Sequence, residues 1–394
     1  MYWGKAQHNL QLDFKLLIPV ESWVPLRILQ LSSAQAFGGG ERHLADLANA
    51  FTARGHSVYV VVRPKSPLLE ELALPKENVI TLPLRNALDA RSAAALAKLV
   101  RNQKIEIVHA HMAHDYPLAA YAVRRNPSAR MIATRHLMFP LNRLHKITLT
   151  HVSRLIAVSN AVARDLRNQR LIAPEKIKVI QNGIDWKKID KACERFNRPA
   201  FCERWGLPAD RPLVGSIGTL TRLKGHEDFL RAAAKLRELE PAAFFIISGT
   251  ESSATREYRV RLERLIEKLR LANSVRIIGR MEDISELHCA LDVFVSASHS
   301  ESFGLAIVEA MAAGTAVVAT ATDGAQEILR PGSTALLVPI GGIEPMVQAM
   351  HELLVNEKER HQIGANAQRE ARERFNIERM VAETEKVYAE VMAR

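Results

Sequence analysis

The sequence predicts an α/β protein made of two domains, each a parallel β-sheet covered by helices on both faces. Short apolar runs of strand length alternate with longer segments of helical periodicity, and strands buried on both faces of a parallel sheet are continuously apolar in this way. The alternation restarts after the polar, proline-containing stretch 194–212. A chain of 394 residues is long enough for two domains.

Seven strands are expected in the first domain, because short apolar runs there are separated by polar or helical segments. In chain order they are 26–31, 58–62, 79–84, 106–112, 131–136, 155–159 and 178–185. Helical periodicity is clearest in residues 41–55, which stop at Gly55, and in residues 92–103.

Six further strands are expected in the second domain, at 212–218, 243–249, 275–279, 293–298, 316–320 and 335–339. Residues 226–239 and 307–313 are predicted helices. We divide the chain into an N-terminal extension (1–25), a first domain (26–200), a second domain (201–375) and a last helix (376–394). This last helix could pack on either domain, including back on the first. Ligands of open α/β sheets bind beyond the carboxyl ends of the strands, so one cleft between the domains is expected.

Composition narrows the class of protein. Hydrophobic residues make up 47% and charged residues 25%, as in ordinary globular proteins. No apolar run approaches the roughly 18–20 residues that span a bilayer, and residues 16–20 are too short for a signal peptide, so a cytoplasmic protein is expected. Cys193, Cys202 and Cys289 form no CxxC pair, so neither a disulfide framework nor a zinc site is expected.

Positive charge is concentrated in the first half of the chain. Residues 1–200 carry a net charge of +15 and residues 201–394 a net charge of −4. Within the positive half, residues 138–154 alternate apolar and basic residues at roughly helical spacing. This pattern fits a helix on an anionic membrane surface or a solvated helix face. Nucleic acid is disfavoured as a partner, because aromatics are few and no binding module is recognisable.

Residues 298–314, SHSESFGLAIVEAMAAG, are the most informative stretch. Gly304 would let a ligand reach the first amides of the following helix, whose positive end favours an anion. The carboxylate of Glu309, further along, would accept hydrogen bonds from hydroxyls but repel phosphate. Together with Glu301 these groups indicate a ligand with a phosphate and a polyol, such as a sugar nucleotide. The alternative is an ordinary helix with a surface Glu.

Two glycine-containing loops suggest where a diphosphate would lie. Arg222 and Lys224 stand on the loop GTLTRLKGH (218–226), where cations would stabilise a departing diphosphate, or form a solvated turn. Glycines 38–40 follow the first strand and permit positive φ and close ligand approach. His43 and Arg63 break the dinucleotide fingerprint, which disfavours NAD and leaves NADP open.

Histidines raise the question of a metal site. The alternating His109 and His111, with His114 nearby, have only Asp115 as a carboxylate in their motif. Neither HExxH nor DxD occurs in the chain, so no metal is expected. His136 closes a predicted strand at the cleft edge, where it would bond to substrate or be an ordinary core or surface histidine.

Taken together, these motifs resemble the retaining glycosyltransferases of family 4, over about residues 26 to 390. The resemblance implies the GT-B fold, in which two Rossmann-like, doubly wound domains face a central cleft. It rests on GGGERH, IAVSNAVARDL, QNGID, GTLTRLKGH, SHSESFGLAIVEAMAAGTAVVAT and DGAQEI.

The resemblance implies transfer of a hexose-like sugar from a UDP-, GDP- or ADP-sugar, with retention and without a metal or other cofactor. Glu309 would hold the ribose, and His136 would approach the donor sugar. Thr219 stands where many members have Arg, and Arg222 is expected to supply that charge. The implied catalytic residues are His136, Arg222, Lys224 and Glu301. The implied donor-binding residues are Gly39, Gly40, Gly218, Arg222, Lys224, Gly279, Arg280, Glu301, Phe303, Gly304, Leu305 and Glu309, with Gly279 and Arg280 near the base.

The expected acceptor is a glycan, a lipid-linked sugar or a lipopolysaccharide-type molecule at the inner face of the cytoplasmic membrane. No dedicated nucleophile is evident, so we expect same-face attack in which the departing phosphate oxygen takes the acceptor's proton. The alternatives are another GT-B enzyme, such as a sugar-nucleotide epimerase or a phosphorylase, and a non-catalytic nucleotide-sugar-binding protein. A pyridoxal lysine site, which phosphorylases need, is not found.

Overall fold

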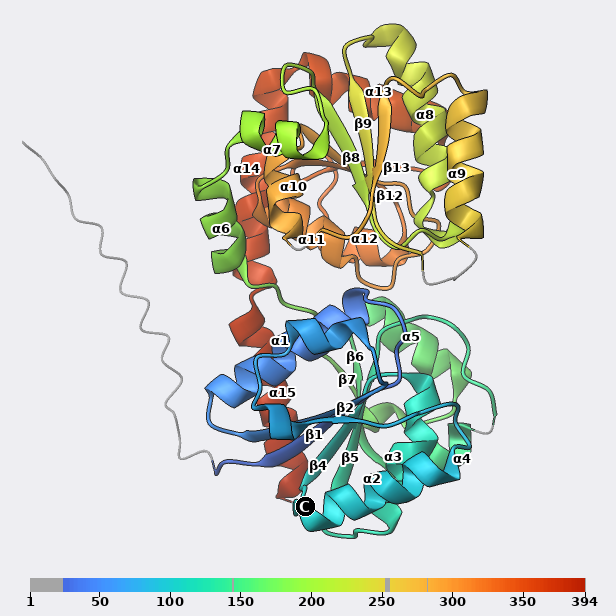
Figure 1. The fold of residues 1–394 in the computed structure, drawn as a ribbon, viewed down its shortest axis with the longest axis vertical. Helices are drawn as coiled ribbons and strands as arrows, with labels where there is room; N and C mark the ends of the chain where they lie inside the picture. Colours follow the sequence, from blue (N-terminus) through green and yellow to red (C-terminus); the bar gives the residue numbers. More distant parts are fainter. Residues whose placement is uncertain (1–23, 144, 252–255, 282, 394) are drawn as a thin grey trace, which may run out of the picture.

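A computed structural model describes residues 24–143, 145–251, 256–281 and 283–393, so most of the predicted N-terminal extension lies outside the described residues. The first domain holds a parallel sheet of seven strands in the order β3-β2-β1-β4-β5-β6-β7 (Figure 1). They are β1 (Arg27–Ser32), β2 (Ser57–Val62), β3 (Val79–Thr81), β4 (Ile107–Ala110), β5 (Arg130–Arg135), β6 (Val152–Ala157) and β7 (Ile177–Val179).

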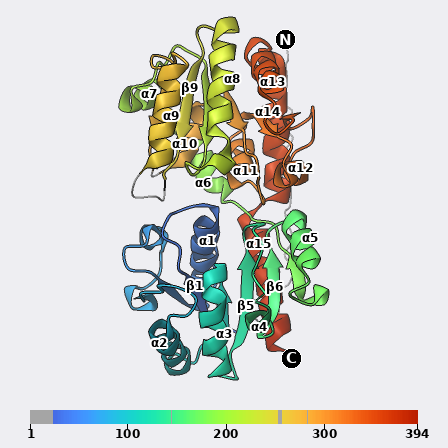
Figure 2. The same cartoon turned by 90° about the vertical axis from the view of Figure 1, so that its right-hand side faces the viewer.

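Five α-helices of the described chain belong to this domain and connect or cover its strands (Figures 1 and 2). They are α1 (Gly39–Ala53), α2 (Ala90–Asn102), α3 (Tyr116–Arg124), α4 (His145–Leu149) and α5 (Asn160–Gln169). Every described strand pairing in the sheet is parallel, as the strand–helix alternation predicted.

The second domain has a parallel sheet in the order β10-β9-β8-β11-β12-β13. Its strands are β8 (Leu213–Ile217), β9 (Phe244–Ser248), β10 (Val275–Ile278), β11 (Val293–Ser296), β12 (Ala316–Thr320) and β13 (Leu336–Val338). The helices after β7 are α6 (Trp186–Glu194), α7 (Arg198–Trp205), α8 (His226–Leu239), α9 (Glu257–Lys268), α10 (Ile284–Ala290), α11 (Leu305–Ala312), α12 (Asp323–Ile328), α13 (Ile343–Val355), α14 (Glu357–Arg374) and α15 (Ile377–Met392).

Both sheets reverse their strand order at one point, between β1 and β4 in the first and between β8 and β11 in the second. Ligands of open α/β sheets bind at such switch points, outside the carboxyl ends of the strands. The two domains lie one above the other, with the loops after these strands at their junction (Figures 1 and 2). The fold therefore brings two loop clusters together from opposite sides.

The chain crosses between the domains twice, and the two crossings run side by side. The Ile184 amide donates to the Phe375 carbonyl at 2.9 Å, and the Ile377 amide donates to the Ile184 carbonyl at 3.1 Å. Helix α6 then packs on α10 and α11 of the second domain. The first crossing thus precedes the division that we placed between residues 200 and 201, while α15 returns to pack on α1 and β6 of the first domain.

Cys193 and Cys289 form a disulfide, with Cα atoms 5.6 Å apart, and Cys202 is free and buried. The expectation of no disulfide was wrong. The two cysteines are 96 residues apart in sequence and meet only because α6 lies across α10. No helix of the described chain has the length and apolarity needed to cross a membrane.

The basic segment 138–154 is not one amphipathic helix. Of the described residues in this segment, which exclude position 144, only 145–149 are helical, and residues 152–157 form strand β6. Pro140 has no backbone N–H to donate to a helix, and Val152 and Leu155 are fully buried in the sheet. Leu137, Phe139 and Ile147 are exposed apolar side chains of this region.

Candidate active site

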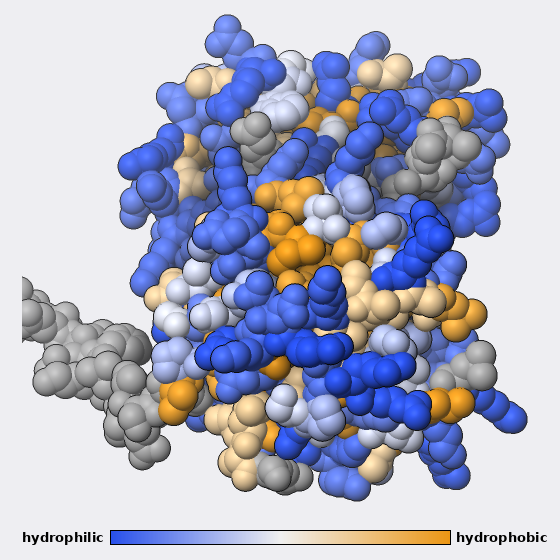
Figure 3. Space-filling view, turned by 60° about the horizontal axis from the view of Figure 1, so that its bottom comes forward, coloured by the Kyte–Doolittle hydropathy of each residue, from blue (hydrophilic) through white to orange (hydrophobic). Residues whose placement is uncertain are grey.

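A cavity of about 730 Å³ lies between the domains, at the carboxyl ends of both sheets. On the face shown in Figure 3, apolar residues gather near the middle of the molecule and most of the surface around them is hydrophilic. Most of the residues expected at the site line this cavity: Gly39, Gly40, His136, Gly218, Lys224, Arg280, Glu301, Phe303, Gly304, Leu305 and Glu309. Arg222 and Gly279 are not among its lining residues.

Lys224 and Glu301 form the charged centre of the second-domain wall. The Lys224 Nζ donates to Glu301 Oε2 at 2.7 Å, and the Ser298 hydroxyl donates to the same oxygen at 3.1 Å. The lysine stem passes over Gly218, where a Cβ would lie 3.3 Å from the lysine Cδ. A fixed ammonium with one carboxylate partner can still bind an anion in the cavity.

Arg222 does not line the cavity, and the local backbone conformation explains why. Arg222 to Lys224 form one turn of 3₁₀ helix, in which residues two apart project in different directions. Lys224 is therefore turned into the cavity while Arg222 is exposed. The turn ends at Gly225, whose φ of +66° and contact with the Ala297 carbonyl leave no room for a Cβ.

The N-terminus of α11 also faces the cavity. Gly304 precedes this helix with a φ of +110°, which glycine adopts without strain, and the first amides of the helix have no partner within it. Gly324 packs against the carbonyls of Glu301 and Phe303, where a Cβ would approach within 2.6 and 2.7 Å. The loop before α11 is therefore held from behind and can present its amides to an anion.

Glu309 lies on α11 one turn beyond these amides and lines the same cavity. Its Oε2 is 3.8 Å from Nε2 of His288, a fully buried histidine. One helical turn, about 5 Å of rise, thus separates the residue from the first amides of α11. This separation gives the wall one region for an anion and another for hydroxyls.

The first-domain wall combines the backbone of glycines 38–40 and His136 with the charged side chains of Glu41 and Arg42. Helix α1 begins at Gly39, and Glu41 folds back to accept the Gly38 N–H at 3.0 Å. Neither Gly39 nor Gly40 has positive φ. A Cβ on Gly39 would lie 3.2 Å from Leu305 and one on Gly40 3.4 Å from His136. These glycines thus leave room for neighbouring groups to approach the backbone closely. They do not adopt the positive φ that glycine also permits.

Contacts between the domains border the cavity. Glu327 of the DGAQEI motif accepts from the Asn160 amide at 2.9 Å and from the Gln181 side chain at 2.7 Å. The Ser159 hydroxyl donates to the Ser302 carbonyl at 2.6 Å. These bonds join the motifs IAVSNAVARDL and QNGID to the second domain.

Arg280 makes a further bridge between the domains. Its guanidinium lies 4.3 Å from the centre of the Phe37 ring and pairs with Glu71 of the first domain. Gly279, although exposed, does not line the cavity.

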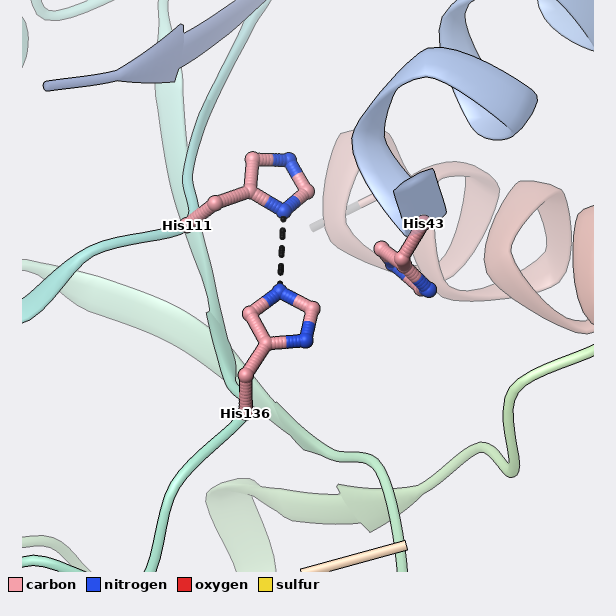
Figure 4. Close-up of side chains that lie close together, drawn as sticks. All are labelled: His43, His111 and His136. Atoms are coloured by element: carbon pink, nitrogen blue, oxygen red, sulfur yellow. Dashed lines mark hydrogen bonds between the residues drawn. The ribbon is translucent and has the colours of Figure 1, made fainter. Parts of the chain in front are cut away.

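The side chains of three histidines, His43, His111 and His136, lie close together at the first-domain wall of the cavity (Figure 4). Nδ1 of His111 lies 3.3 Å from Nε2 of His136, and His43 lies beside both. Burial lowers the pKa of His43 to about 4 and lowers the pKa values of His111 and His136 well below their ordinary range. All three rings are therefore neutral near pH 7.

The three histidines are also close enough to hold a metal ion, because one nitrogen of each lies within 4.8 Å of the others. Both nitrogens of His111 are already hydrogen-bonded, to His136 and to Gln30, so an ion would have to replace the bond to His136. His109 is bonded to Tyr388 and Thr134, and His114 is exposed. Metal independence stays a prediction.

Two family models match the chain. Residues 197–370 match the model of the glycosyl transferases group 1, and residues 37–188 match the model of glycosyltransferase family 4. The chain belongs to the family 4 glycosyltransferases. The resemblance inferred from the motifs is confirmed.

The glycosyltransferase has relatives of known activity. It is 22% identical over 368 residues to N-acetyl-alpha-D-glucosaminyl L-malate synthase of Bacillus anthracis, covering 88% of this chain and 92% of that protein. It is 29% identical over 280 residues to D-inositol 3-phosphate glycosyltransferase of Salinispora arenicola, covering 68% of this chain and 59% of that protein. The chain thus spans nearly all of the first relative and under two thirds of the second.

Solved structures show the same architecture. A glycosyltransferase from Rickettsia africae superposes with a TM-score of 0.82 at 23% identity, covering 94% of this chain and 99% of that one. HepE of Anabaena, in complex with UDP and glucose, superposes with a TM-score of 0.79 at 23% identity, covering 92% and 99%. The predicted GT-B fold is confirmed.

Sequence reasoning missed several residues around the glycosyltransferase's site. Glu327 and Ser159 were recognised only as members of the motifs DGAQEI and IAVSNAVARDL. Their role in joining the domains could not be predicted, because it arises only when the two domains are in contact. His43 was read only as a break in a glycine fingerprint. Gln30 and Tyr388, which adjoin the histidines, carry no signal in the sequence, because they are far from the motifs and from each other.

Proposed function

We propose that this glycosyltransferase moves a hexose-like sugar from a nucleoside-diphosphate sugar to a hydroxyl of an acceptor, with retention of configuration. One observation carries the proposal: a single cavity is lined by the Lys224–Glu301 pair, the first amides of α11 and the carboxylate of Glu309. The Lys224–Glu301 pair and the α11 amides are suited to bind an anion, and the Glu309 carboxylate is suited to accept hydrogen bonds from hydroxyls. The UDP and glucose bound to HepE, which shares the fold, fit this division.

Bond breaking would place new negative charge on the departing diphosphate. Lys224 is positioned to stabilise that charge, and the α11 amides add fixed dipoles. As the bond between the sugar carbon and the phosphate oxygen breaks, the acceptor oxygen bonds to the same face of that carbon, and its proton passes to the departing oxygen. Glu301 is already held by Lys224 and Ser298, which makes it a poor free nucleophile. Trapping a covalent glycosyl–enzyme would contradict this route.

The acceptor is proposed to carry negative charge. The first half of the chain is strongly basic, and such a field concentrates anionic molecules. A lipid-linked or lipopolysaccharide-type acceptor and the inositol 3-phosphate in a relative's name share this charge. We further propose that the protein docks on an anionic bilayer at its cytoplasmic face, through Arg143 and Lys146 and the exposed apolar side chains Phe139 and Ile147.

Vesicle sedimentation tests the membrane proposal. With Arg143→Glu and Lys146→Glu together, binding to vesicles containing anionic lipid should fall, since each cation near such a surface contributes about 1 kcal/mol. Donor affinity should be unchanged, because neither residue lines the cavity. Equal sedimentation of the wild-type protein with neutral and anionic vesicles would contradict the proposal.

A donor screen tests the main proposal. Thermal shifts with UDP, GDP, ADP and their sugars should single out one base, because a ligand of the native state raises its stability. With the matching donor and a phosphorylated polyol acceptor, proton NMR of the product should show the donor's anomeric configuration. Binding without transfer to any acceptor would instead indicate a nucleotide-sugar-binding protein, and conversion of the free sugar nucleotide would indicate an epimerase.

A further inference from the structure

A continuous chain of buried polar side chains runs from the last helix to the cavity. Tyr388 on α15 bonds to His109 Nδ1 at 2.6 Å and accepts from Gln30 Nε2 at 3.3 Å. Gln30 Oε1 then bonds to His111 Nε2 at 2.7 Å, and His111 Nδ1 bonds to His136 Nε2 at 3.3 Å. Of these residues, only His136 lines the cavity.

The bonds fix which nitrogen of each ring carries hydrogen. Gln30 Oε1 can only accept, so His111 Nε2 must donate to it. Because the ring is neutral, His111 Nδ1 has a lone pair and must accept from the N–H at Nε2 of His136. The neutral His136 is then left with a lone pair on Nδ1, which points away from His111 (Figure 4).

Tyr388 accepts from the NH₂ group of Gln30 in this arrangement, which leaves Gln30 Oε1 facing His111. The tyrosine hydrogen is then available to donate to Nδ1 of His109, whose Nε2 donates to the Thr134 hydroxyl at 2.7 Å. Gln30, His109 and Tyr388 are all fully buried, so water does not offer replacement partners and every group depends on its neighbour.

We propose that Tyr388 is a positioning residue, which acts through Gln30 and His111 to hold His136 with its Nδ1 lone pair free for a hydroxyl of the bound sugar. This inference rests on the proposed function of the cavity. It gives the returning helix α15 a role in the site, although α15 contributes no residue to the cavity lining.

Removing the tyrosine hydroxyl should reverse the donor and acceptor roles along this series of hydrogen bonds. In Tyr388→Phe the Gln30 NH₂ group loses its acceptor, so the amide can rotate and donate to His111 Nε2. His111 Nδ1 then carries hydrogen and donates to His136 Nε2, which leaves the hydrogen of His136 on Nδ1. The group offered to the ligand changes from an acceptor to a donor, and the packing of the aromatic ring on Phe51 is kept.

Nitrogen NMR of histidine-labelled protein without ligand tests the inference, because protonated and unprotonated ring nitrogens resonate far apart. The His136 signals are assigned by their loss in His136→Gln. Wild-type protein should show hydrogen on Nε2, and Tyr388→Phe should show hydrogen wholly or partly on Nδ1. Tyr258→Phe is the matched control, since among the described residues that buried hydroxyl has no hydrogen-bond partner, and it should leave the His136 signals unchanged.

Kinetics separate this inference from the proposed function. With the matching donor, Tyr388→Phe should lower kcat by about tenfold, the order expected for one misdirected hydrogen bond, and leave the donor KM nearly unchanged. Changed His136 signals with normal kcat would support the hydrogen-bond chain and overturn the role of His136 in the reaction.

Unchanged signals in Tyr388→Phe would overturn the inference itself. Gln30→Met is a second variant that removes both amide partners at similar size. It should also shift the His136 signals, and if Tyr388→Phe does not fold, unchanged signals in Gln30→Met would overturn the inference.

Discussion

The two walls of the cavity are built differently. The second-domain wall carries charged groups, Lys224, Glu301 and Glu309, from two short segments of the chain. The first-domain wall also holds Glu41 and Arg42. Around His136, however, it offers glycine backbone and a neutral histidine, backed by polar residues that come from both ends of the chain. One wall is thus suited to hold charge, and the other to shape the space and orient hydroxyl groups.

Burial explains the difference. Lys224 and Glu301 keep 27% and 14% of their side-chain surface exposed, so water still reaches both and the desolvation cost of the pair is moderate. His111, behind the first wall, is buried, and His136, in that wall, is half-buried. Desolvation lowers the pKa values of both well below the ordinary range, so both rings are neutral. Charged groups bind by attraction, whereas neutral buried groups depend on correct hydrogen-bond direction.

Replacing the lysine tests the charged wall and has the largest expected effect. Lys224→Ala should lower turnover by ~10²-fold or more, because the cation facing the departing diphosphate is lost. Arg222→Ala is the matched control, since that cation sits on the same turn but is exposed and outside the cavity lining, and it should keep near-normal turnover. If both variants lost turnover equally, the total positive charge of the loop, and not the position of Lys224 in the cavity, would determine turnover.

Neutralising Glu309 should have a smaller effect, confined to binding. Glu309→Gln should weaken nucleoside diphosphate binding by about tenfold, as expected when hydrogen bonds to a charged acceptor become neutral. Calorimetry with the ribonucleotide and its 2′,3′-dideoxy analogue provides the check. The variant should lose affinity only for the ribonucleotide, and an equal loss for both would place the ribose elsewhere.

Removing metal ions should have no effect on turnover. Both nitrogens of His111 are committed to Gln30 and His136, and a bound ion would have to break the second bond. Activity after dialysis against a chelator, compared with activity after added Zn²⁺ or Mn²⁺, gives the measurement. Recovery of lost activity by one ion would show that the histidines bind metal instead of one another.

The same comparison explains what the sequence could predict. Strands of both sheets were recognisable from local apolar runs, and the second-domain wall from residues 218–226 and 298–314, because each motif is continuous in the chain. The surroundings of His136 were only partly predictable, because Gln30, His111 and Tyr388 meet only after folding. Distance along the chain likewise hid the disulfide between Cys193 and Cys289.

Local geometry also decided details that residue type alone did not. Two cations on one loop were expected to act together, but a 3₁₀ turn directs only Lys224 into the cavity. The expected helix over 138–154 did not form, because the alternating pattern crosses a proline and the start of a buried strand.

A crystal structure with the matching nucleoside-diphosphate sugar tests the central claim most directly. The account predicts the diphosphate at the α11 amides and Lys224, the ribose at Glu309, and the sugar beside Nδ1 of His136. A nucleotide bound outside the cavity, or bound inside it with the ribose at Lys224 and the diphosphate at Glu309, would contradict the account.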